Sequence, residues 1–150
     1  MSVPIAVTPI RILLVDDEDL ARQRLRALLG KRTDFEIIGE CATGTEAVAS
    51  IRSLRPDVVL LDVQMPELDG FDVISEVGAS NMPTVIFTTA YDDYAIDAFE
   101  VGAMDYLLKP VDEERFNRTL DRASRRFRES GGEAGASQIS ALLRKLSAIS

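Results

Sequence analysis

Short apolar runs alternate with amphipathic segments along most of this 150-residue chain. Five of the runs contain few or no polar residues, which is typical of strands that are covered on both faces within a parallel sheet. They lie at residues 12–15, 35–38, 58–61, 85–87 and 106–108. We expect each run to form a buried strand.

The segments between these runs have apolar residues spaced three or four positions apart, as on the buried face of a helix. The stripes include Leu25, Leu28, Val48, Ile51, Phe71, Ile74, Ala95, Ala98, Phe116 and Leu120. Alternation of strand and helix, five times over, predicts an α/β fold: a doubly wound parallel sheet with right-handed crossovers. We expect five strands in the order 2-1-3-4-5, as in flavodoxin-like folds.

The regular alternation ends near residue 128, which suggests four segments. We expect an N-terminal extension over residues 1–9, a folded domain over 10–128, a flexible linker over 129–138 and an amphipathic helix over 139–150. The linker sequence ESGGEAGASQ is small and polar. The helix that follows is too short to be stable alone. It either folds back on the domain or frays, or it is a connector or dimer-forming helix that leads to a second domain outside this chain. We favour the second interpretation.

Composition limits the possible chemistry. The chain has one cysteine and no histidine, which excludes an internal disulfide, Cys/His zinc sites and His-dependent nucleophilic catalysis. Any bound metal must therefore have oxygen ligands. The net charge of −8 disfavours contact of this segment with nucleic acid. No apolar run approaches the roughly 18 residues of a membrane span, and the first residues lack a secretory pattern, so we expect a cytoplasmic protein.

Reactive side chains follow four of the five predicted strands. Asp16 and Asp17 follow the first strand, Asp62 the third, Thr89 the fourth and Lys109 the fifth. Parallel strands place their carboxyl ends at one edge of the sheet, which gathers these residues into one cleft. Clustered carboxylates repel one another, and a hard cation such as Mg²⁺ or Mn²⁺ relieves that repulsion. The alternative is that the first two acids only cap the next helix.

These residues resemble the receiver domain of two-component response regulators over residues 10–127. The matching features are the acidic pair Asp16-Asp17, the phosphoacceptor loop DVQMPELDG at 62–70, the switch hydroxyl Thr89 before Ala90, the switch aromatic Tyr106, and Lys109 with its cis proline Pro110. The resemblance is specific because five spaced features agree in order and context.

The resemblance implies that Asp62 accepts a phosphoryl group beside a metal ion. The metal ligands would be Asp17, Asp62 and the backbone carbonyl of Gln64, with Asp16 acting through water and Lys109 balancing charge. A sensor histidine kinase or a small phosphodonor would supply the phosphoryl group. On this view the chain is a phosphoacceptor signalling domain that assists its own phosphorylation and dephosphorylation, rather than an enzyme.

The resemblance also implies how such a domain would signal. Thr89 would move toward the phosphoryl group and Tyr106 would follow, while Gln64 and Tyr91 lie where receivers tune dephosphorylation. The surface formed by the fourth helix, the fifth strand and the fifth helix would then pair with a second copy of the chain. Residues that we place on this surface are Asp97, Glu100, Arg115, Arg118 and Arg122.

Within the receivers, residues 87–110 are similar to those attached to LytTR-type (LytR/AlgR-like) DNA-binding domains. This similarity implies that the helix at 139–150 leads to an output domain that controls transcription. Two alternatives remain from other classes. A haloacid-dehalogenase-like phosphatase would have a second aspartate two positions after its nucleophile, where Gln64 stands, and an inactive receiver would serve only as an interaction module.

Overall fold

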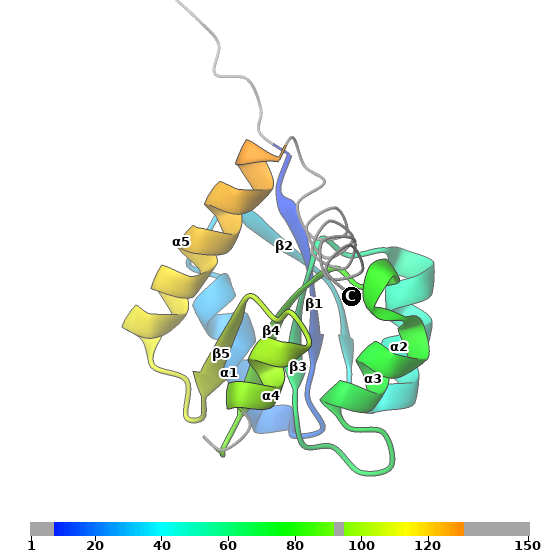
Figure 1. The fold of residues 1–150 in the computed structure, drawn as a ribbon. Coiled ribbons are helices and arrows are strands. Elements are labelled where there is room, and N and C mark those ends of the chain that lie inside the picture. Colours follow the sequence, from blue (N-terminus) through cyan, green and yellow to red (C-terminus); the bar gives the residue numbers. More distant parts are fainter. Residues whose placement is uncertain (1–7, 92–94, 131–150) are drawn as a thin grey trace, which may run out of the picture.

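A five-stranded parallel sheet forms the centre of the computed structural model, which describes residues 8–91 and 95–130 (Figure 1). The strands are β1 (Ile10–Val15), β2 (Phe35–Cys41), β3 (Val58–Asp62), β4 (Thr84–Thr89) and β5 (Asp105–Leu108). Their order in the sheet is β2-β1-β3-β4-β5, which confirms the predicted topology. All five predicted strands are present, and each begins or ends up to three residues beyond the apolar run that predicted it.

Helices cover both faces of the sheet. They are α1 (Asp19–Leu29), α2 (Gly44–Leu54), α3 (Gly70–Val77), the short 3₁₀ helix η1 (Ala79–Asn81), α4 (Ala95–Glu100) and α5 (Glu113–Glu129). Helices α1 and α5 lie on one face of the sheet, and α2 and α3 lie on the other (Figure 1). This doubly wound arrangement follows from the strand–helix alternation in the sequence.

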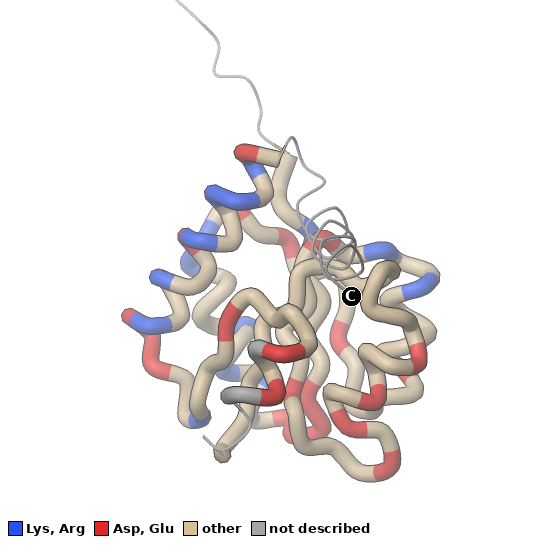
Figure 2. The backbone as a smooth tube through the Cα atoms, in the orientation of Figure 1, with Lys and Arg blue, Asp and Glu red and all other residues tan. Residues whose placement is uncertain are grey.

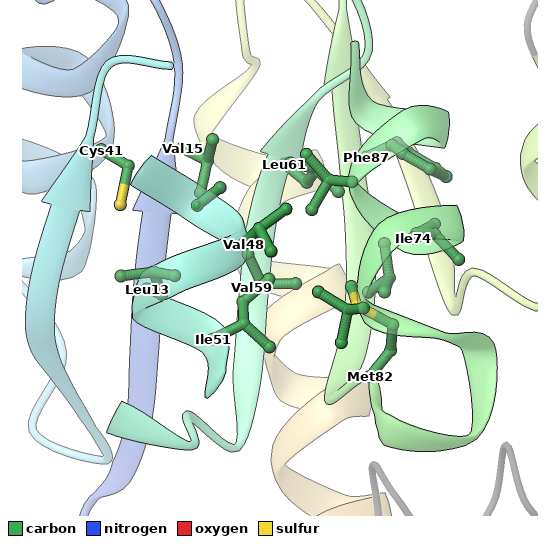
Figure 3. Packing of buried hydrophobic residues seen from close by; sticks show 14 of the residues in the cluster. Leu13, Val15, Cys41, Val48, Ile51, Val59, Leu61, Ile74, Met82 and Phe87 are labelled. Carbon is green, nitrogen blue, oxygen red and sulfur yellow. The ribbon is translucent and has the colours of Figure 1, made fainter. Parts of the chain in front are cut away.

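The two sides of each central strand belong to different apolar clusters. In β1, Leu13 and Val15 pack with α2 and α3 (Figure 3), whereas Ile12 and Leu14 pack with α1 and α5. All four of these side chains are fully buried. Because both faces of the strand are covered, its sequence shows no polar alternation, and this is the reason that continuous apolar runs predicted the strands correctly.

Side-chain caps fix where the helices around the sheet rim begin. The Asp69 side chain accepts a hydrogen bond from the Asp72 backbone N–H, and the Asp72 side chain accepts one from the Asp69 N–H, which forms a capping box at the start of α3. Thr43 caps α2, and Asp112 caps α5 by accepting from the Arg115 N–H. These caps hold the loops that follow β2, β3 and β5 in defined positions.

Glycine is needed at the start of α3, close to the end of β3. A Cβ atom added at Gly70 would lie 2.6 Å from the Asp62 carbonyl oxygen and 3.0 Å from the Phe87 ring. Only a residue without a side chain lets the helix approach the strand this closely. The loop between Asp62 and α3 is therefore folded tightly against the rim of the sheet.

The predicted segment boundaries are tested only in part by the described residues. Helix α5 ends at Glu129, so the folded domain extends one residue into the range predicted as linker. Most of the N-terminal extension, the rest of the linker and the whole helix predicted at 139–150 lie outside the described residues, and they remain predictions. In the part of the chain that is described, no helix is long and apolar enough to cross a membrane.

Candidate functional site

Three carboxylates meet at the carboxyl-end rim of the sheet. Asp16 and Asp17 directly follow β1, and Asp62 is the last residue of β3, which pairs with β1. One oxygen from each of the three lies within 4.8 Å of the others, a spacing that fits a single cation. Asp16 and Asp62 are buried, whereas Asp17 is exposed. The clustering predicted from the strand ends is therefore confirmed.

Lys109 reaches this cluster from β5, a strand at the edge of the sheet. It follows β5, and its peptide bond to Pro110 is cis. The Lys109 Nζ lies 2.7 Å from Asp16 Oδ2 and 3.3 Å from Asp62 Oδ2. Glu18 is a further partner at 3.6 Å, which the sequence analysis did not identify. One ammonium group thus faces several carboxylates and leaves an excess of negative charge.

Burial and this charge excess change the acidity of the site. Burial, together with the charge of Asp16, raises the pKa of Asp62 from 3.8 to about 7, although Lys109 acts in the opposite direction. Burial disfavours the charge on Lys109, but its hydrogen bond to Asp16 and the charge of Asp62 outweigh that effect and raise its pKa. At neutral pH the lysine is therefore charged, and Asp62 is poised between its two protonation states.

The donor set fits a hard divalent cation better than any other metal. Every candidate ligand is a carboxylate oxygen, with no sulfur or imidazole in the cluster. Asp16 is already engaged, because its Oδ1 accepts from the Glu18 N–H at 2.9 Å and its Oδ2 pairs with Lys109. The contacts of Asp62 are longer, 3.3 Å to Lys109 and 3.2 Å from the Gln64 N–H, and Asp17 is exposed, so these two carboxylates are better placed for direct ligation.

The backbone around the cluster is fixed by contacts from neighbouring segments. The Gln64 N–H donates to Asp62 Oδ1 at 3.2 Å, which sets the start of the loop after β3. Arg22 of α1 donates to the Asp16 carbonyl at 2.5 Å and pairs with Asp19 and with Glu40 of β2. The sequence analysis missed Arg22, since nothing in its local pattern distinguishes it from an ordinary surface arginine.

The two predicted switch residues are connected through Tyr91. Asp62 is paired with Thr88 in the sheet, so Thr89 lies one residue further along the neighbouring strand, and its side chain is buried. The Thr89 hydroxyl accepts from the Tyr91 N–H at 3.2 Å, and the half-buried Tyr106 donates its hydroxyl hydrogen to the Tyr91 carbonyl. Residues 92–94, which follow in the loop, lie outside the described residues.

A further carboxylate with several partners, the partly buried Asp105 at the start of β5, was not predicted. It accepts hydrogen bonds from Thr119, Arg115 and Arg122 of α5. Its signal in the sequence was an acidic residue at the beginning of an otherwise apolar strand, directly before Tyr106. From the sequence, the two arginines were placed on the surface that would pair with a second copy of the chain, and in the structure they also form these intramolecular ion pairs.

Known proteins share both the sequence pattern and the fold. A family model described as the response regulator receiver domain matches residues 12–121. The transcriptional regulatory protein BtsR of Salmonella typhi is 50% identical over 113 residues, which are 75% of this chain and 47% of that protein. The chain thus spans about half the length of the curated relatives it matches.

Solved structures of response regulators have a similar fold. The response regulatory domain of protein mrkE from Klebsiella pneumoniae is 30% identical with a TM-score of 0.71, and the match covers 79% of this chain and 98% of that one. The CheX-CheY complex with BeF₃ and Mg²⁺ from Borrelia burgdorferi matches at 27% identity and a TM-score of 0.68, covering 75% of this chain and 87% of that one. Strand order, acidic rim and family match agree, and the chain belongs to the response regulator receiver domain family.

Proposed function

We propose that Asp62 is the phosphoacceptor of this receiver. The observation that carries the proposal is the position of Asp62, buried beside Asp16 and Asp17, with the Lys109 ammonium 3.3 Å from its Oδ2. Metal and lysine on either side of a carboxylate are what phosphoryl transfer requires, because that reaction depends on positioning and charge neutralisation.

Each residue of the proposed site has a separate role. Asp17, Asp62 and the backbone carbonyl of Gln64 would hold Mg²⁺ or Mn²⁺, with Asp16 acting through water. A bound divalent cation supplies neutralisation of phosphate charge. An oxygen of Asp62 attacks phosphorus, and the bond from phosphorus to the donor breaks, with its electron pair leaving on the donor. Lys109 stays charged throughout and stabilises the added phosphoryl oxygens.

The donor must be another molecule. The chain has no histidine, so a phosphohistidine has to come from a sensor histidine kinase, and a small phosphodonor can replace it chemically. Gln64 and Tyr91 flank the site, on the loops after β3 and β4, and would tune the approach of the water that removes the phosphoryl group. The chain acts as a signalling domain in this account.

Phosphorylation would be read out on the surface formed by α4, β5 and α5. It adds about −1.5 to −2 charge at Asp62, which the Thr89 hydroxyl and Lys109 can bind, and Tyr106 would follow the threonine. We infer that the changed surface pairs with a second copy of the chain through mixed charges that include Asp97, Glu100 and Arg118, all of which are exposed.

The output of the whole protein is proposed to be transcriptional. The curated relatives are about twice as long as the matched region, and several are named transcriptional regulatory proteins. The similarity of residues 87–110 to LytTR-attached receivers favours an output domain of that class, joined through the linker and the helix at 139–150. Receiver contact with DNA is not expected, given the net charge of −8.

Titration with beryllium fluoride in the presence of Mg²⁺ tests the proposed site, because this complex imitates a phosphoryl group on a carboxylate. We expect saturable binding by the wild type and no binding by Asp62→Asn, which keeps the shape of the side chain but removes its charge. Asp121→Asn is the matched control, since Asp121 is exposed on α5 and pairs only with Arg32 among the described contacts. Unchanged binding by Asp62→Asn would refute the assignment.

A further inference from the structure

Acidic residues gather at the carboxyl-end rim of the sheet, where β1 and β3 end and α1 begins (Figure 2). Arg22 lies near the start of α1 against this rim, and its charged side chain is only 15% exposed. A cation is not favoured near the amino end of a helix, because the helix dipole is positive there. The position of Arg22 must therefore be explained by its contacts.

The nitrogens of the Arg22 guanidinium contact three different segments. Nη1 donates to the Asp16 carbonyl oxygen at 2.5 Å, Nε donates to Glu40 of β2 at 3.2 Å, and Nη2 donates to Asp19 at 3.1 Å. A planar group with fixed donors can make these contacts at the same time, whereas a lysine ammonium is a point charge on a flexible chain. The guanidinium thus joins the end of β1 to the edge strand β2 and to the first turn of α1.

The Asp16 carbonyl belongs to the peptide group that leads into Asp17. Because a peptide group is planar, a contact that fixes its carbonyl oxygen also fixes the direction of the Asp17 N–H and Cα. Asp16 is held at other points too, since its N–H donates to the Cys41 carbonyl at 3.0 Å and its Oδ1 accepts from the Glu18 N–H at 2.9 Å. Asp17 itself is exposed, so the direction of its carboxylate depends on this peptide more than on packing.

We propose that Arg22 is a positioning residue for the cation site, which holds the Asp16–Asp17 peptide so that the Asp17 carboxylate faces Asp62. The inference rests on the proposed function, in which Asp17 and Asp62 are metal ligands. The described contacts of Arg22 include the peptide carbonyl but neither of these two carboxylates. Its positive charge by itself repels a nearby cation, so Arg22 favours metal binding only through geometry.

Isothermal titration calorimetry with Mg²⁺ tests this role through the direction of the change in affinity. By charge alone, Arg22→Met would bind Mg²⁺ more tightly than the wild type, because a repelling charge has been removed. Positioning predicts the opposite: the dissociation constant should rise about tenfold, as is typical when a group that orients a metal ligand is lost. Arg22→Lys keeps the charge but not the planar fork of donors, so its dissociation constant should rise as well.

Arg26→Met is the matched control. Arg26 lies one turn further along α1 and pairs with the same Glu40 oxygen at 2.5 Å, but it has no described contact with the Asp16 carbonyl. Both methionine variants lose one positive charge and one ion pair with Glu40, and only Arg22→Met also loses the contacts with Asp16 and Asp19. We expect Arg26→Met to bind Mg²⁺ at least as tightly as the wild type. Urea denaturation shows that each variant is folded before it is titrated.

Each result leads to a different conclusion. An unchanged or lower dissociation constant in Arg22→Met would overturn the positioning role and leave the proposed function intact. Wild-type affinity in Arg22→Lys, which replaces Arg22→Met if that variant does not fold, would also overturn it, since the planar fork would not be needed. Equal weakening in Arg26→Met would overturn it as well, because the shared ion pair would then be responsible. A wild type that binds no Mg²⁺ would overturn both the proposed cation site and the role of Arg22.

Discussion

At the residue scale, the central feature is a carboxylate whose acidity is set by its surroundings. Asp62 lies among apolar strands and next to the charged Asp16, and both conditions disfavour its ionised form. Lys109 offsets only part of this cost. A bound cation would stabilise the ionised carboxylate, so the same electrostatics that disfavour three crowded carboxylates favour metal binding.

The raised pKa of Asp62 predicts a specific pH dependence of Mg²⁺ affinity. The metal requires the ionised carboxylate, while the proton is held with a pKa of about 7. As pH falls below that value, protons compete with the metal, so the apparent dissociation constant should rise about tenfold between about pH 8 and about pH 6. Isothermal titration calorimetry at several pH values measures this change.

Replacing the neighbouring acid provides the control for this prediction. Asp16→Asn removes the charge that contributes to the high pKa of Asp62, so the loss of Mg²⁺ affinity should begin at a lower pH than in the wild type. An affinity that does not vary with pH over the same range in the wild type would contradict the electrostatic description of the site.

At the scale of elements, the site depends on how closely α3 approaches the end of β3. Gly70→Ala would place a Cβ atom 2.6 Å from the Asp62 carbonyl oxygen, in backbone that cannot move without shifting the strand. We expect a loss of about 1–3 kcal/mol in the free energy of unfolding, as is typical of overpacking, measured by urea denaturation.

Gly30→Ala is the matched control for this prediction. Gly30 follows α1 with φ −61°, and an added Cβ there would have its closest contact at 3.2 Å, so the effect should be clearly smaller. Equal stability of Gly70→Ala and the wild type would show that the loop before α3 adapts, and that its tight packing is not required.

The strands were predicted from the sequence more completely than the side-chain contacts between elements, and the reason is physical. Strands covered on both faces must be apolar throughout, so each strand was visible from its own few residues. The edge position of β2 agreed with the absence of a charged residue after Cys41. The Asp105 contacts with α5 and the Lys109 contact with Glu18 could not be predicted, because they join residues far apart in sequence that no local pattern relates.

At the scale of the whole molecule, the two ends of β5 contact different parts of the protein. Its carboxyl end delivers Lys109 to the acidic rim, and its amino end carries Asp105, which holds α5. Tyr106 lies between them, so a change at the rim has a short path to the surface that we propose for pairing with a second copy. In the strand order, only β4 lies between β3, which carries Asp62, and β5, which carries Tyr106.

Chemical mapping of the phosphorylated residue tests the central claim most directly. The protein is incubated with Mg²⁺ and acetyl phosphate, reduced with borohydride, which converts an aspartyl phosphate to homoserine, and digested for mass spectrometry. We predict homoserine at position 62 alone, and none when Mg²⁺ is removed with a chelator. Conversion at Asp16 or Asp17 instead, or equal labelling in Asp62→Asn, would contradict the account.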